Sequence, residues 1–134
     1  MNTQQLDRMG KFLFGYRYLG TFPLDKVPLH FVTDAALLHF IINTHTSNLP
    51  GQHWIAVTVH KGEKAYVFDS FGIPPPRLLI YQLKQRGIRK IYYSKHQVQS
   101  FNQQNCGQLA LIHLLNVDLR GGTRGLSGWK PTIH

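Results

Sequence analysis

Alternating hydrophobic and polar positions predict two neighbouring β-strands in the middle of the chain. Residues 53–60 and 64–69 alternate and are rich in β-branched residues, and the short segment 61–63 between them contains a glycine. The pattern therefore predicts an antiparallel hairpin. Because the first strand of such a pair begins beside the end of the second, we expect His53 and Asp69 to lie at the same end of a sheet.

Three further segments have patterns that favour helices. Residues 34–43 are apolar on most sides, which predicts a helix buried against a sheet. Residues 77–86 follow three prolines and end before Gly87, a residue that commonly terminates helices. A third helix is predicted to begin at Cys106, where a polar loop gives way to an apolar run.

The remaining segments carry weaker patterns. Residues 3–9 fit a short polar helix, and the aromatic-rich residues 11–23 are broken by glycine and proline, which suits irregular extended structure. Residues 88–93 fit a third strand. We expect one domain over residues 1–120, followed by a glycine-rich, flexible tail over residues 121–134.

Composition agrees with one folded domain. The chain has 134 residues, of which 43% are hydrophobic and 16% charged. No apolar run approaches the ~20 residues of a membrane helix, and the first residues lack the apolar region of a signal peptide, so we expect no membrane association. A single cysteine cannot form an internal disulfide. We therefore expect a reducing, intracellular location and a monomer.

The charge is strongly positive, with 15 Lys and Arg against six acids and a pI near 10. No acid lies between Ser70 and Val117. Such a field attracts polyanions, and nucleic acid is the commonest one in cells. A merely solvated basic surface is the alternative, since no base-reading motif accompanies the charge. The candidate nucleic-acid-binding residues are Lys84, Arg86, Arg89, Lys90 and Lys95.

The only cysteine stands where a helix start would favour its thiolate, the nucleophilic form. His53 would take the thiol proton, and Asp69 would orient the imidazole. Gln99 and the Cys106 backbone N–H would donate to the oxyanion of an acyl-transfer reaction. Each residue also has a structural reading: a buried cysteine, a polar strand end, a turn cap and one glutamine among several. Taken together, the four favour nucleophilic catalysis.

These residues resemble the adenovirus protease (adenain) family, in the clan shared with SUMO-specific proteases. The resemblance rests on the His-Trp pair at 53–54, the Asp-Ser-Phe-Gly segment at 69–72, and Gln99 seven residues before the Cys-Gly pair at 106–107. Short similarities at residues 18–21, 31–33 and 42–44 extend it upstream. In all it covers roughly residues 16–116.

The resemblance implies a cysteine endopeptidase with an α+β fold. A central antiparallel or mixed sheet would be flanked by helices, with Cys106 at the N-terminus of a buried one. It implies no cofactor, protein substrates of viral or mobile-element origin, and stimulation by DNA. A viral enzyme of this kind would act in the host nucleus and the virion.

Departures from the family, a hypothesis of self-cleavage and two competing functions also follow. Adenovirus enzymes usually carry Glu where this chain has Asp69, and the chain ends soon after the cysteine helix, without their C-terminal helical part. A disulfide-linked peptide activator is not expected, because no second cysteine is present. The segment 119–123, Leu-Arg-Gly-Gly-Thr, resembles sites cut by such proteases, so self-cleavage after Gly122 is a hypothesis beside a plain glycine-rich tail. The competing functions are a protease removing ubiquitin-like modifiers after Gly-Gly and a non-catalytic basic module that binds nucleic acid.

Overall fold

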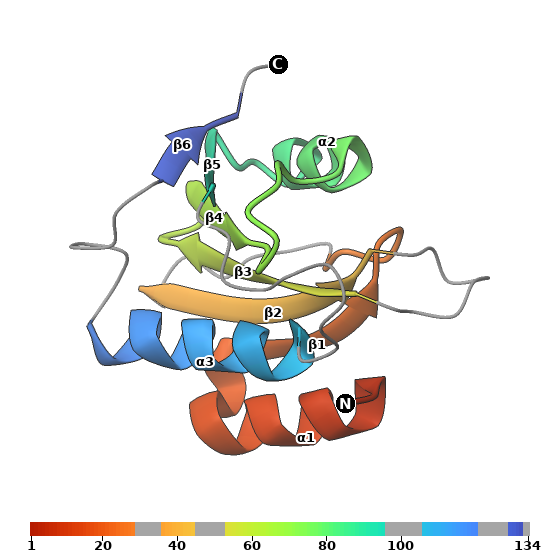
Figure 1. Cartoon of the computed structure of the whole chain (residues 1–134). Coiled ribbons are helices and arrows are strands. Elements are labelled where there is room, and N and C mark those ends of the chain that lie inside the picture. The colour runs from red at the N-terminus through yellow and green to blue at the C-terminus, as the bar shows by residue number, and fades with distance from the viewer. Residues whose placement is uncertain (29–35, 45–52, 96–105, 121–128, 133–134) are drawn as a thin grey trace.

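The computed structural model describes residues 1–28, 36–44, 53–95, 106–120 and 129–132. Helices and strands are mixed along the chain, as the prediction of an α+β fold requires (Figure 1). In chain order the elements are α1 (Thr3–Phe14), the 3-10 turn η1 (Gly15–Arg17), β1 (Tyr18–Pro23), β2 (Leu37–Asn43), β3 (Trp54–His60), β4 (Lys64–Phe68), α2 (Arg77–Gln85), β5 (Lys90–Ser94), α3 (Cys106–Leu119) and β6 (Trp129–Pro131).

The six strands form one mixed sheet in the order β1-β2-β3-β4-β5-β6. β1 is parallel to β2 and β4 is parallel to β5, whereas the other three neighbouring pairs are antiparallel. The predicted hairpin is confirmed as β3 and β4, which pair from Ala56 with Phe68 to His60 with Lys64. Residues 61–63 join the paired residues His60 and Lys64, and Lys61 and Gly62 have the positive φ typical of a tight hairpin turn.

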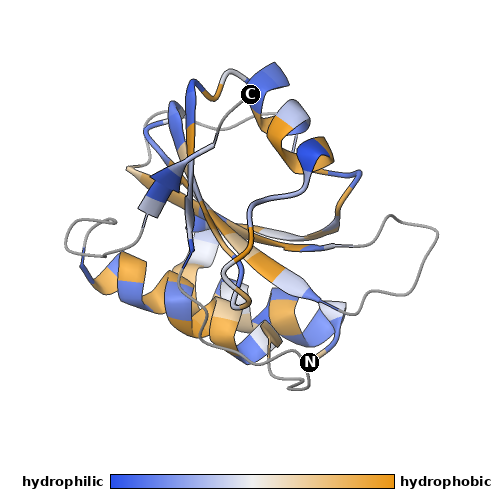
Figure 2. Ribbon diagram, turned by 45° about the horizontal axis from the view of Figure 1, so that its top comes forward, coloured by the Kyte–Doolittle hydropathy of each residue, from blue (hydrophilic) through white to orange (hydrophobic). Residues whose placement is uncertain are grey.

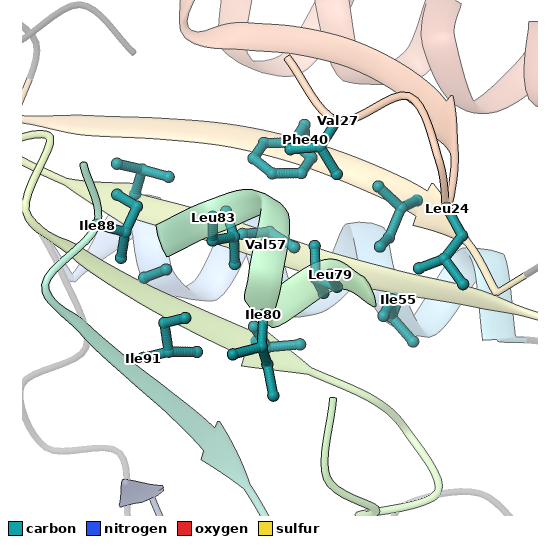
Figure 3. Packing of buried hydrophobic residues seen from close by; sticks show 14 of the residues in the cluster. Leu24, Val27, Phe40, Ile55, Val57, Leu79, Ile80, Leu83, Ile88 and Ile91 are labelled. Carbon is teal, nitrogen blue, oxygen red and sulfur yellow. The ribbon is translucent and has the colours of Figure 1, made fainter. Parts of the chain in front are cut away.

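Helices cover both faces of the sheet (Figure 1). α2 lies on one face, and α1 and α3 lie side by side on the other. Hydrophilic and hydrophobic residues are interspersed along α1 (Figure 2), as expected of a helix with one buried face, whereas α3 is mostly hydrophobic. The core beneath α2 brings Leu79 and Leu83 of the helix onto Phe40, Val57 and other strand residues (Figure 3). The second core lies between the sheet and the α1–α3 layer.

The prediction of a helix at residues 34–43 is wrong. Residues 37–43 form strand β2, between β1 and β3, and residues 34–35 lie outside the described part of the chain. Both faces of β2 are buried, since Leu38 and Phe40 enter one core and Ile41 the other. A strand buried on both faces is apolar without alternation, so over a short run it has the same pattern as a buried helix.

The prediction for the first residues is also wrong in part. α1 continues through Phe14, beyond the short helix predicted over 3–9 and into the segment expected to be extended. Asn2 and Gln5 form a capping box, and every fourth residue from Leu6 is buried. The helix continues through Gly10. A side chain there would clash, because its Cβ would stand 2.4 Å from the Tyr18 ring, which explains the glycine. Tyr18 itself begins β1, the regular strand that the aromatic segment forms.

The other predicted elements are found. α2 ends one residue earlier than expected, and Gly87 follows it with a φ of 94°, which explains the glycine. β5 and α3 begin at Lys90 and Cys106. β6 was not predicted: Trp129–Pro131, within the expected tail, pairs with β5 and extends the sheet. None of the described helices is both long and apolar enough to cross a membrane.

Candidate active site

His53 and Asp69 meet at one end of the sheet, as the hairpin register predicted. His53 directly precedes β3, and Asp69 directly follows β4. The two side chains are joined by a hydrogen bond of 2.7 Å, in which the Nε2–H of His53 donates to Oδ1 of Asp69. The Asp69 side chain is only 4% exposed, and that of His53 is 13% exposed. Water therefore competes little for this bond.

The turn after β4 holds both members of the pair. The backbone N–H of Phe71 donates to Oδ1 of Asp69, at 2.9 Å, and the N–H of Gly72 closes the turn on the Asp69 carbonyl. Gly72 has a φ of 72°, which explains the glycine there. The Phe71 ring stacks on His53 with a centroid distance of 4.4 Å and an interplanar angle of 10°. Sequence reasoning missed this role of Phe71, although the Asp-Ser-Phe-Gly segment contained it.

Cys106 is the first residue of α3 and is buried. Burial, the largest single influence, raises the pKa of its thiol, but the opposing interactions together lower that pKa below its usual value. These interactions are a hydrogen bond with the His53 side chain, the positive charge of His53, and hydrogen bonds from the backbone N–H groups of Trp54 and Gly107. The thiolate is therefore favoured.

The imidazole responds in the complementary way. Burial lowers the pKa of His53, but the hydrogen bonds and charges of Asp69 and Cys106 outweigh it and raise that pKa to about 9. Because Nε2 is bonded to Asp69, Nδ1 is the ring nitrogen left for the thiol. Both shifts favour an imidazolium–thiolate pair, the reactive state of a nucleophilic cysteine.

Gly107 lets neighbouring side chains come close to the nucleophile. A Cβ at this position would lie 3.3 Å from the Trp54 ring, 3.4 Å from Leu6 and 3.5 Å from Met1. The indole N–H of Trp54 also donates to the Met1 carbonyl, at 3.2 Å. The start of α1 and the start of β3 are thereby packed against the first turn of α3.

The structure does not bring the remaining predicted site residues together in one place. Gln99 lies outside the described residues. Arg86 is partly buried, and its guanidinium donates to the carbonyls of Val27, Pro28 and Gln82. Lys84, Arg89 and Lys90 gather near the start of β5, whereas Lys95 follows its end. Within the described part of the chain, no three His, Cys, Asp or Glu residues are grouped as a metal site would need.

The fold is one that a solved protease shares. The crystal structure of ASFV pS273R protease is similar to this chain with a TM-score of 0.62 and 14% sequence identity, over 85% of this chain and 55% of the protease. The chain thus spans about half the length of that protease. The selenomethionine crystal structure of the same protease matches with a TM-score of 0.48 and 19% identity, over 60% of this chain and 34% of that chain. No family model and no curated protein matches the chain.

Proposed function

We propose that this protein is a cysteine endopeptidase of the adenovirus-protease type, with Cys106 as nucleophile, His53 as general base and acid, and Asp69 as the residue that orients the imidazole. The single observation that carries the proposal is the pair of hydrogen bonds that links Asp69 to His53 and His53 to the Cys106 thiol at the start of α3. The shared fold of a solved protease supports it.

In the proposed reaction the Cys106 thiolate attacks the carbonyl carbon of a substrate peptide bond. The carbon–nitrogen bond then breaks, and the imidazolium of His53 gives its proton to the leaving amine. Water, deprotonated by the same imidazole, hydrolyses the thioester and regenerates the thiol. Asp69 keeps the ring oriented and stabilises its positive charge in both steps. Gln99 remains our proposed donor to the oxyanion, together with the Cys106 backbone N–H.

Labelling with a thiol-directed peptide probe tests the proposal. The wild-type chain should be labelled rapidly, Cys106→Ala should not be labelled, and His53→Ala should be labelled about 10²–10⁴ times more slowly. Lys61→Asn serves as the control, because Lys61 is exposed in the turn between β3 and β4, at the end of the sheet opposite His53 and Asp69. Equal labelling rates for wild type and His53→Ala would refute the triad.

The substrate class needs a separate measurement. We favour proteins of viral or mobile-element origin over ubiquitin-like modifiers, on the resemblance to adenovirus proteases. A fluorogenic ubiquitin-like substrate ending in Gly-Gly distinguishes the two, since only a deconjugating protease would turn it over. The self-cleavage hypothesis is tested by mass spectrometry: incubated wild-type protein should lose the residues after Gly122, and Cys106→Ala should keep them.

DNA as a stimulating partner is a further proposal, supported by the excess of Lys and Arg. Peptidase activity measured with and without DNA over a salt series should show a stimulation that salt removes. Salt-sensitive DNA binding in a chain that no peptide probe labels would instead favour the non-catalytic basic module.

A further inference from the structure

A second polar site lies at the end of the sheet opposite His53 and Asp69. Three cationic side chains line a hollow of about 240 Å³: Lys84 comes from the last turn of α2, and Arg89 and Lys90 from the start of β5. Thr132, which follows β6, brings a hydroxyl group, and Ile91, Tyr92 and Pro131 complete the lining. The hollow therefore joins three elements that the sequence separates widely.

These three cations have no anionic partner among the described residues. The ion pairs found there use Asp7, Asp69 and Asp118, and none involves Lys84, Arg89 or Lys90. The nearest acid along the fold is Glu63, whose backbone carbonyl accepts from the N–H groups of both Arg89 and Lys90. Its carboxylate forms no ion pair with a described residue. Within the described part of the chain, the positive charges of Lys84, Arg89 and Lys90 are therefore not paired.

The strand register adds further positive charge beside the hollow. Lys64 of β4 stands directly opposite Lys90 of β5. Like charges directly opposite each other on neighbouring strands are destabilising. His60 of β3 stands opposite Lys64, and its pKa is lowered by burial and by the charges of Lys61 and Lys64. A bound anion would relieve this repulsion.

We propose that this hollow is a binding site for a compact polyphosphate. Lysine ammonium groups, an arginine fork and a hydroxyl are donors suited to phosphate oxygens. A hollow of about 240 Å³ is several times the share of one water molecule in the liquid, about 30 Å³, so more than one phosphate group can enter.

A nucleic-acid backbone presents the same phosphate chemistry, but it is extended and needs a track of cations. Here the charges converge on one point: Arg86 is turned onto backbone carbonyls, and Lys95 lies beyond the other end of β5. The geometry therefore favours a small, highly charged anion over a polymer. Because the hollow is lined by α2, β5 and the residue after β6, the anion would also hold the C-terminal strand against the sheet.

Sodium tripolyphosphate is the probe, titrated calorimetrically into the full chain carrying Cys106→Ala, so that no proteolysis interferes. Replacing Lys84 and Lys90 together by Gln should weaken binding at least about tenfold, since two phosphate contacts are lost. The matched control replaces Arg77 and Lys95 by Gln, which removes the same charge from exposed positions outside the hollow. The Arg77/Lys95 control should bind tripolyphosphate almost as well as the parent chain. Tripolyphosphate should also raise the melting temperature of the parent chain and of this control.

Equal weakening in the two double variants would overturn the proposal, because the attraction would then be a general property of a basic chain. Absence of binding to the parent chain would overturn it as well. A single-stranded oligonucleotide provides the second arm. If it binds through Lys84 and Lys90 and tripolyphosphate fails to displace it, the site takes a nucleic-acid backbone and the compact-ligand proposal fails. Neither arm depends on peptidase activity.

Discussion

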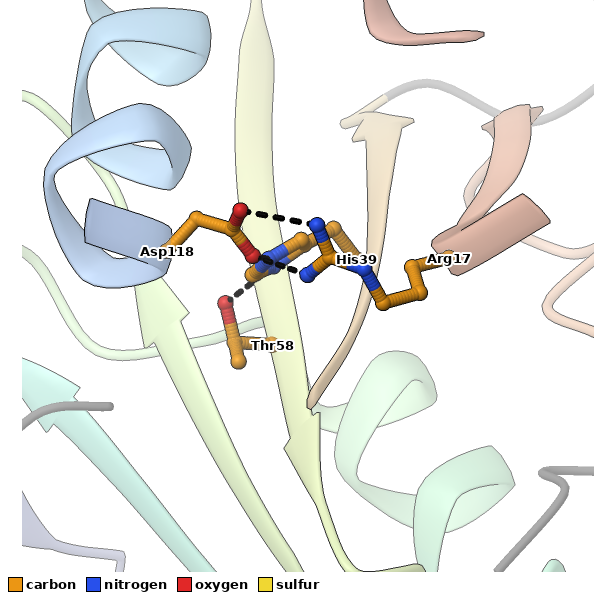
Figure 4. A network of polar contacts seen from close by, with 4 residues as sticks. All are labelled: Arg17, His39, Thr58 and Asp118. Atoms are coloured by element: carbon orange, nitrogen blue, oxygen red, sulfur yellow. Dashed lines mark hydrogen bonds and ion pairs between the residues drawn. The ribbon is translucent and has the colours of Figure 1, made fainter. Parts of the chain in front are cut away.

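A histidine–aspartate pair lies at each end of helix α3, and the two histidines differ in the direction of their pKa shifts. At its first residue, Cys106 contacts His53, which is paired with Asp69. Near its last residue, Asp118 accepts a 2.9 Å hydrogen bond from Nε2 of His39 (Figure 4). The pKa of His53 is raised to about 9, whereas that of His39 is lowered.

The neighbours of each pair explain the difference. Burial lowers the pKa of both histidines, but the His39 side chain is fully buried. Asp118 is also held by the Arg17 guanidinium, whose charge opposes protonation of His39. Nδ1 of His39 accepts from the Thr58 hydroxyl at 2.9 Å, so the neutral ring is satisfied on both sides (Figure 4). The second ring nitrogen of His53 faces the Cys106 thiol instead of a hydroxyl. No arginine is among the causes of the His53 pKa shift.

A hydrogen bond between an imidazole and a carboxylate therefore does not by itself indicate catalysis. The pair at the C-terminal end of α3 ties the helix to η1, β2 and β3, and its histidine stays neutral. The pair at the N-terminal end leaves one ring nitrogen for a thiol that can lose its proton. The partner on the second ring nitrogen, and the charge beside the carboxylate, decide between a structural and a chemical role.

The largest expected difference comes from removing each histidine. His53→Ala should lower peptidase activity about 10²–10⁴-fold, because the thiol loses its base and the leaving group its acid. His39→Gln should keep most of the activity at temperatures where the variant is folded, since a glutamine amide can replace both hydrogen bonds. Rates on a peptide substrate, measured beside circular dichroism, check this. Similar losses of activity in two folded variants would break the comparison.

The pH dependence sharpens the assignment of charge at the first pair. The Cys106 pKa is lowered and the His53 pKa is raised to about 9, and both shifts favour an imidazolium–thiolate pair. Activity should therefore fall as the pH rises through about 9, where His53 loses its proton. Alkylation of Cys106 by iodoacetamide should already be fast below the usual thiol pKa. In His53→Ala the alkylation profile should move to higher pH, and an unmoved profile would contradict the coupling.

Removing Asp118 tests the second pair through stability. Asp118→Ala leaves the positive charge of Arg17 and the Nε2–H of His39 without their partner, so the free energy of unfolding should fall by roughly 2–4 kcal/mol. The control is Asp7→Ala, which breaks the exposed pair with Lys11 and should cost less than about 0.5 kcal/mol. Urea denaturation monitored by circular dichroism measures both. Equal costs would show that the buried network adds nothing beyond a surface pair.

A smaller effect is expected from a third histidine, His113, which lies between the two pairs on α3. Its ring stacks on Phe68 at 4.2 Å, its Nε2 has no hydrogen-bond partner among the described residues, and burial lowers its pKa to about 3. Between pH 6.5 and about 3 the unfolded chain therefore binds this proton and the folded chain does not, so stability falls as the pH falls.

His113→Phe keeps the stacking and removes this proton. Its stability should decline less steeply than that of the wild type over the same acid range, and the two should converge in slope above pH 6.5. Melting temperatures measured across the range check the slopes. Parallel curves would show that His113 is protonated in the folded chain.

Much of the candidate site could be predicted because its parts are local. The alternation of residues in the hairpin was enough to bring His53 beside Asp69, and a polar loop before an apolar run was enough to begin a helix at Cys106. The second pair could not be found in this way. Arg17 and His39 lie 101 and 79 residues before Asp118, and no short-range pattern links them.

The sequence by itself determined the hairpin, the ends of α2 and the placing of a cysteine at a helix start, because turn residues and hydrophobic periodicity act over a few neighbours. Only the tertiary structure decided that residues 37–43 are a strand buried on both faces, since a short apolar run fits either element. It also decided which histidine carries a charge. A pKa depends on burial and on every charge within a few ångströms, and those neighbours come from distant parts of the chain.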